Sequence, residues 1–422
     1  MTVTAPDTSA RKLGARYWRL FGAASLSSLA DGTLKVALPL LARSYTDAPL
    51  AIAGVGFAAM LPWLLFSLPA GAIVDRSDRR TVLLAANLVR AVILVLATIL
   101  AVIEVGSIAL IYAVAFGAGV AETFYATAAQ AIVPQLVDRA QLDRANALQQ
   151  IADQATNQFA GPALGGLLAG VGVGLALGGP AVVWAAAAAM LVTLTGRFIT
   201  RREHPVHTAP LRSDIAIGLR FLARSVALRS VCVCVAITNF AGAAATAVFV
   251  VYAVGHGSVL GLSPGGFGLL MAASAIGSLL GSLVIRPATD VLGHRILFGI
   301  NALTQAMQIL VPVLTRNVVA IGAAYALSGL GVALWNVGTV TMRQRIVPER
   351  LLGRVISTHR LIAWGSLALG ALAGGLVAQV AGLVTLFWGA TAMTLAGALA
   401  LLPLTSARVD KEARDAVADH RI

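Results

Sequence analysis

Apolar runs long enough to cross a lipid bilayer recur along most of this chain. A helix needs about 20 mostly apolar residues to span the hydrocarbon core. Six runs precede a polar segment near residue 210 and six follow it: 20–43, 51–74, 82–103, 108–133, 147–170 and 180–199, then 226–254, 265–285, 296–314, 318–342, 355–380 and 384–404. The pattern predicts an all-α membrane protein of twelve transmembrane helices in two six-helix halves.

The polar segments divide the chain into five parts. We expect an N-terminal segment at 1–19, one half at 20–199, a linker at 200–225, the other half at 226–404 and a tail at 405–422. The linker places Ile215, Leu219 and Leu222 at helical spacing after Ser213, which indicates a short amphipathic helix on the membrane surface. The stretch 75–80 is echoed at 290–295, and this weak repeat supports two parallel halves.

Composition and charge agree with a membrane protein. Of the 422 residues, 58% are hydrophobic and 12% charged, and the mean hydropathy is +0.86. Lysine and arginine exceed aspartate and glutamate by 13. If the N-terminus is cytoplasmic, most basic residues fall in the cytoplasmic segments, as membrane orientation requires. Their short, separate clusters exclude a nucleic-acid partner. We therefore expect a multi-pass protein of the cytoplasmic membrane with both termini in the cytoplasm.

A charged motif joins the second and third spans. Asp75, Arg76, Arg79 and Arg80 lie within the stretch 71–80. An acid and several arginines at a helix junction can bind a facing helix end in one conformation and release it in another. These four residues are candidate gating residues. The alternative is that the arginines only anchor the topology.

A second motif lies in the fifth span and contains Gly161, Pro162, Gly165 and Gly166. Proline removes a backbone donor and bends a helix, whereas glycines allow close packing against a neighbour that must rock past. These residues are further gating candidates. Ordinary packing between membrane helices is the alternative.

The two motifs resemble those of the major facilitator superfamily, and the resemblance covers nearly the whole chain. Asp78 stands where a glycine is commonest in the superfamily's signature loop, and the Gly-Pro motif is similar to one found in its exporters. The stretches around Asp31, Glu122 and Trp335 resemble the subgroup that includes drug, macrolide and siderophore exporters. Unlike many drug antiporters, the fourth span lacks an embedded arginine. The resemblance implies export of a small molecule by alternating access, driven by proton antiport.

Charged side chains at membrane depth are functional candidates because burial there costs several kcal/mol. Glu122 and Asp31 are the candidate proton-coupling residues, since a buried carboxyl group can load and unload a proton near neutral pH. A structural hydrogen bond is the alternative for Glu122. Asp31 and Lys35 are one helical turn apart and could instead form a static pair. For Arg90 we expect snorkelling or structural pairing.

Candidate substrate contacts lie in both halves. A polar stripe at 150–157 precedes the Gly-Pro motif and ends on Asn157, which indicates a helix face toward a water-filled vestibule. Hydrogen bonding between helices is the alternative. The candidate set is Lys35, Asn157, Asn239, Trp335 and Asn336.

No zinc-ligand spacing, phosphate-binding loop or nucleophile–base set is present in the sequence, so we expect no metal, no cofactor and no enzyme. The expected partners are a small-molecule substrate, protons and the lipid bilayer, with the chain as a monomer. Two alternatives are an uptake symporter or lysophospholipid transporter of the same fold. A third, of another class, is a transport-inactive membrane receptor or assembly factor.

Overall fold

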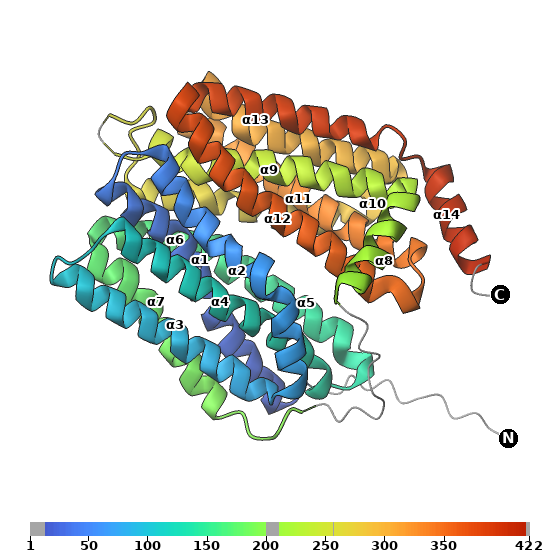
Figure 1. The fold of residues 1–422 in the computed structure, drawn as a ribbon, viewed down its shortest axis with the longest axis horizontal. Coiled ribbons are helices and arrows are strands. Elements are labelled where there is room, and N and C mark those ends of the chain that lie inside the picture. The colour runs from blue at the N-terminus through green and yellow to red at the C-terminus, as the bar shows by residue number, and fades with distance from the viewer. Residues whose placement is uncertain (1–12, 200–210, 256, 419–422) are drawn as a thin grey trace.

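The computed structural model describes residues 13–199, 211–255 and 257–418, and these are almost entirely helical (Figure 1). The expected terminal segments and linker therefore lie partly outside the described residues. The helices of the first half are α1 (Ala15–Tyr45), α2 (Pro49–Arg76), α3 (Arg79–Val102), α4 (Ile108–Ile132), α5 (Leu142–Asp153), the π-helical turn η3 (Gln154–Ala160), α6 (Gly161–Val171) and α7 (Val173–Val192).

The second half is built in the same way. Its helices are α9 (Val226–Ala253), α10 (Pro264–Leu314), α11 (Val318–Ile346), α12 (Glu349–Ala381) and α13 (Leu383–Ala398). Two further helices, α8 (Leu211–Arg224) and α14 (Ser406–Ala418), lie at one end of the molecule (Figure 1). The amphipathic helix expected in the linker is α8, which begins two residues before Ser213.

Ten helical segments of the described chain are long and apolar enough to cross a membrane. Two of them belong to α10, which is divided at Gly293 by a positive φ of 69°. The other two spans expected from the sequence correspond to α1, which carries Asp31 and Lys35, and to the succession α5–η3–α6, which begins with polar residues. The predicted helical membrane fold is confirmed.

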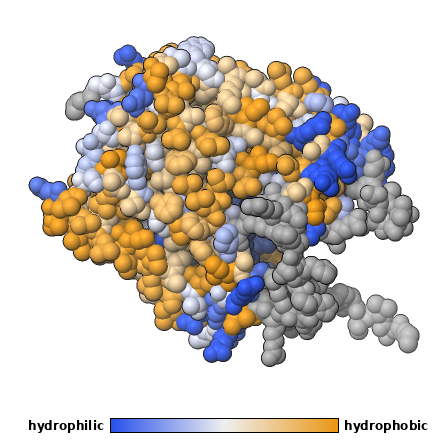
Figure 2. Space-filling model, viewed as in Figure 1, coloured by the Kyte–Doolittle hydropathy of each residue, from blue (hydrophilic) through white to orange (hydrophobic). Residues whose placement is uncertain are grey.

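The surface is that of a membrane protein. On α3, Leu88, Val92, Leu96 and Ile99 are each about half exposed and follow the helical period. Figure 2 shows apolar residues over the middle of the molecule and hydrophilic residues mainly toward its two ends. Such a belt is stable against lipid and would be costly in water.

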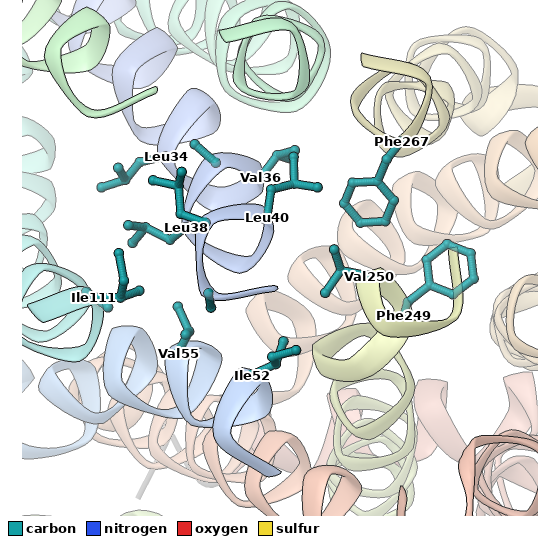
Figure 3. Close-up of a cluster of buried hydrophobic side chains, with 14 of the residues drawn as sticks. Leu34, Val36, Leu38, Leu40, Ile52, Val55, Ile111, Phe249, Val250 and Phe267 are labelled. Carbon is teal, nitrogen blue, oxygen red and sulfur yellow. The ribbon is translucent and has the colours of Figure 1, made fainter. Parts of the chain in front are cut away.

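The cores show where the two halves meet. One hydrophobic cluster contains residues of both halves, including Leu34 and Val55 from the first and Phe249 and Phe267 from the second (Figure 3). Two other clusters are each confined to one half: one around Tyr17 and Phe198 in the first half, and one around Phe298 and Trp335 in the second. The halves are thus joined at one end, and each has its own core at the end that holds α8 and α14.

Glycines allow the helices of the two halves to pack closely at the joined end. A Cβ on Gly166 would come within 2.4 Å of the carbonyl oxygen of Pro264, and one on Gly375 within 2.9 Å of the Cα of Leu50. These contacts pair α6 with α10 and α12 with α2. Halfway along α2, Trp63 stacks on Trp364 of α12 with ring centroids 4.4 Å apart.

Candidate functional site

The centre of the first half holds a buried arginine shared by two acids. Arg90 of α3 is fully buried. Its Nη2 donates to Oε2 of Glu122 on α4 at 2.6 Å, and its Nη1 lies 3.3 Å from Oδ1 of Asp31 on α1. Nη1 also donates to the hydroxyl of Ser27 at 3.2 Å. For Arg90 the sequence left snorkelling and structural pairing open, and the structure contains the pairing.

Two aromatic rings enclose the guanidinium. The Arg90 Cζ lies 5.0 Å from the ring centroid of Tyr125 and 5.2 Å from that of Trp184. Both distances fit cation–π contact, which strengthens as water is excluded. The rings therefore help to hold the guanidinium in place beside the two acids. Ser27, Tyr125 and Trp184 were not singled out from the sequence, because a lone serine or aromatic residue in a span carries no local signal.

The cluster has one more carboxylate than cations. Arg90 supplies one positive charge, while Asp31 and Glu122 supply two negative charges when both are ionised. Both acids contact the same guanidinium group. Their side chains are 15% and 29% exposed, whereas the arginine is not exposed at all. One proton delivered to the acids would make the cluster neutral.

Lys35 forms its hydrogen bond with another element. Its Nζ donates to Oδ1 of Asn157 in η3 at 2.6 Å, while Asp31 turns to Arg90. Two turns before Lys35 on α1, Ser28 donates to Asp153 at 2.9 Å. The ion-pair partner of Asp31 in the structure is therefore Arg90, and not the Lys35 that the sequence suggested.

The fifth-span motif brings η3 against α1. The amide of Gly161 donates to the carbonyl of Thr156, five residues back, which is the π-helical pattern, and Pro162 has no amide to donate. A Cβ on Gly32 would lie 2.3 Å from the carbonyl oxygen of Asn157, and one on Gly165 would lie 2.3 Å from that of Thr33. Backbone contact at these glycines places Asn157 beside Lys35.

Most arginines of the charged loop bind their own half in this conformation. Arg80 donates to the carbonyls of Leu191 and Val192 at 3.1 and 2.8 Å, and the buried Arg79 donates to Phe198. The Leu191 and Val192 carbonyls lie at the C-terminal end of α7, where the helix dipole favours cations. Asp75 is half-buried and Arg76 is exposed. The contacts give Arg79 and Arg80 an anchoring role, and gating by the loop stays a prediction.

The candidates of the second half lie apart from the charge cluster. Asn239 of α9 donates to the carbonyl of Ala363 on α12 at 3.1 Å. Trp335 is buried with its ring centroid 4.7 Å from that of Phe298, whereas the neighbouring Asn336 is exposed. Trp335 thus packs within the second half here, and Asn336 is exposed on α11.

The described part of the chain contains no cluster of side chains suited to a metal ion. Across residues 13–199, 211–255 and 257–418, no group of three or more His, Cys, Asp or Glu side chains could hold a metal ion. The two cysteines, Cys232 and Cys234, are free and buried in α9.

Comparison with known proteins places the chain in a family. A family model described as transmembrane secretion effector, of the major facilitator type, matches residues 13–421. The chain belongs to the major facilitator superfamily. This facilitator is therefore a membrane transporter and not an enzyme, and it is a multi-pass protein of the cytoplasmic membrane.

Curated relatives of this facilitator include transporters of mycobacteria. It is 26% identical to the multidrug efflux pump Tap of Mycolicibacterium fortuitum over 384 residues, which cover 86% of this chain and 90% of the relative. It is 36% identical to an uncharacterised MFS-type transporter of Mycobacterium tuberculosis over 149 residues, about a third of each chain.

Solved structures share the fold of this facilitator at low sequence identity. The nucleoside transporter NupG superposes with a TM-score of 0.73 at 12% identity, over 92% of this chain and 99% of the other. A bacterial homologue of the iron transporter ferroportin in an inward-facing state gives 0.72 at 16% identity, over 94% and 100%. At these identities the likeness shows the major facilitator fold.

Proposed function

We propose that this transporter exports a small molecule in exchange for protons, as a monomer, with Glu122 and Asp31 as the proton-carrying groups. The observation that supports it most is the shared arginine. Two carboxylates that share one buried guanidinium leave one negative charge without a cation of its own in direct contact. An unmatched charge in a low-dielectric site is costly, and binding one proton removes it.

The arrangement also offers a way for the proton to leave. Glu122 is the more exposed of the two acids, whereas Arg90 is fully buried. If the end that carries α8 and α14 faces the cytoplasm, as the basic residues favour, the halves are joined on the outer side and apart on the inner side. The acids would then exchange protons with the cytoplasm in this state and with the exterior after the halves rock.

Export rests on two supports beyond the cluster. The Gly-Pro motif of the fifth span is the one that resembles exporters, and its glycines contact both α1 and α10. The relative that is matched over most of its length is an efflux pump. At 26% identity, the substrates of that pump are not assigned to this chain. We propose Lys35, Asn157, Asn239, Trp335 and Asn336 as substrate contacts. Asp75 and Arg76 are proposed to join Arg79, Arg80 and the fifth-span glycines in gating.

Vesicles of both orientations test the direction and the driving force. Fluorescent drugs should accumulate in inverted vesicles that carry a proton gradient with an acidic interior, and the gradient should be required. Right-side-out vesicles with an acidic exterior should extrude the same dyes. Accumulation by right-side-out vesicles under an inward proton gradient would instead establish uptake by symport.

A further inference from the structure

Lys35 differs from the other charged side chains at the centre of the first half. Asp31, Arg90 and Glu122 contact one another, whereas Lys35 has a neutral partner, the amide oxygen of Asn157. An ammonium group has three donors, so two of the three remain for another acceptor. Lys35 is also exposed, although Thr33, Leu34, Val36 and Ala37, its neighbours along α1, are all buried.

The exposed ammonium and the unmatched carboxylate lie along one face of α1. Asp31 and Lys35 are four residues apart, which puts them on the same side of the helix and roughly 6 Å apart along its axis. Glu122 extends the negative end, because both acids contact Arg90. A molecule bound along this face would meet a surplus negative charge at one end and an ammonium with free donors at the other.

We propose that the substrate is amphoteric, with a basic amine that binds beside Glu122 and Asp31 and an acidic group that binds Lys35 and Asn157. The proposal deepens the proposed function and rests on it. Together Asp31, Glu122, Arg90 and Lys35 carry no net charge when ionised, so a simple cation or anion would leave one end of the site unmatched. A zwitterion matches both ends, and unmatched charges are costly in a site of low dielectric.

The same arrangement makes the proton and the substrate compete. The amine needs the ionised form of Glu122 or Asp31, because a protonated carboxyl group has no charge to offer it. A proton on the acids therefore removes the partner of the amine and leaves the contact at Lys35 intact. Mutual exclusion at one end of the site is what exchange of substrate for proton requires.

Matched ligands separate the two ends. The first series is ciprofloxacin, its methyl ester and its N-acetyl derivative, and the second is 4-(aminomethyl)benzoate with the same two modifications. Affinities for the purified transporter are measured by calorimetry without any gradient. The amphoteric parent should bind about tenfold or more tightly than either blocked derivative, since each lost charge-assisted hydrogen bond removes that much.

Variants assign each preference to a residue. Lys35→Gln should abolish the preference for the free acid over the ester and keep the preference for the free amine over the N-acetyl derivative. Glu122→Gln should abolish the preference for the free amine and keep the preference for the free acid. Lys35→Arg keeps the positive charge and should retain the acid preference. That result would attribute the lost acid preference of Lys35→Gln to the missing charge and not to loss of folding. Arg16→Gln, an exposed cation at the start of α1, is the matched control and should change neither.

Two results would overturn the proposal: no preference for the amphoteric parent in either series, or an acid preference that survives Lys35→Gln. Failure here is distinct from failure of proton antiport. If dye accumulation still depends on the gradient and on Glu122, only the substrate class is wrong. If the ligand preferences are as expected and dye accumulation does not depend on the proton gradient, the antiport proposal is wrong.

Discussion

At the scale of single residues, Arg90 organises the site. It draws Asp31 and Glu122 together from positions 59 and 32 residues away. The sequence predicts charged groups at membrane depth, since they interrupt apolar runs, and it predicts the helical neighbour Lys35 as a partner for Asp31. It could not predict the pairing with Arg90, because that contact depends on how α1, α3 and α4 pack.

Replacing Arg90 should destabilise the protein. Arg90→Gln leaves two carboxylates without their cation, and breaking a buried pair costs roughly 3–5 kcal/mol. The free energy of unfolding, measured in detergent with denaturant, should fall by that order, while Arg16→Gln should leave it unchanged.

A compensating variant checks the cause. Arg90→Gln combined with Asp31→Asn and Glu122→Gln removes all three charges and should recover much of the stability, without proton-driven transport. Wild-type stability of Arg90→Gln alone would show that the arginine does not hold the acids together.

At the scale of the elements, local patterns predict the helices and packing decides their details. The apolar runs locate the spans, and Gly161 and Pro162 mark the irregular fifth span. The pattern separates the eighth and ninth spans, and in the structure the non-helical residue Gly293 divides α10 between them. The π-helical turn η3 was not predicted, because it depends on the contact of Gly32 with the Asn157 backbone.

Gly166 offers a test of how the two halves meet. Even alanine would place a Cβ 2.4 Å from the Pro264 oxygen and 2.9 Å from the Gly268 backbone, so Gly166→Ala should weaken the joined end. In a background without Cys232 and Cys234, Ala53→Cys at this end is buried and should react slowly with an impermeant maleimide added outside. Gly166→Ala should raise that rate severalfold.

The control is another glycine-to-alanine change. Gly389 of α13 has nothing within 4 Å of its Cβ position, so Gly389→Ala should not alter the labelling rate. An unchanged rate in Gly166→Ala would mean that the contact between α6 and α10 does not hold the joined end closed.

At the scale of the whole molecule, two halves share a core at one end and keep separate cores at the other. The internal repeat and the charge distribution predict two six-helix halves. Neither predicts which end is joined, because both conformations of a rocking transporter use the same helices and differ only in contacts between halves. The stacked pair Trp63 and Trp364 lies near the middle of α2 and α12. It had no signal in the sequence beyond two tryptophans in apolar runs.

The central claim is that protons drive transport through Glu122, and reconstituted vesicles test it most directly. Wild-type protein and Glu122→Gln are compared in two assays with one transported dye: accumulation driven by a pH gradient, and exchange of labelled for unlabelled dye without a gradient. We predict that Glu122→Gln retains exchange and loses gradient-driven accumulation, because the halves can still rock but no proton is carried. Accumulation by Glu122→Gln at the wild-type level would contradict the account.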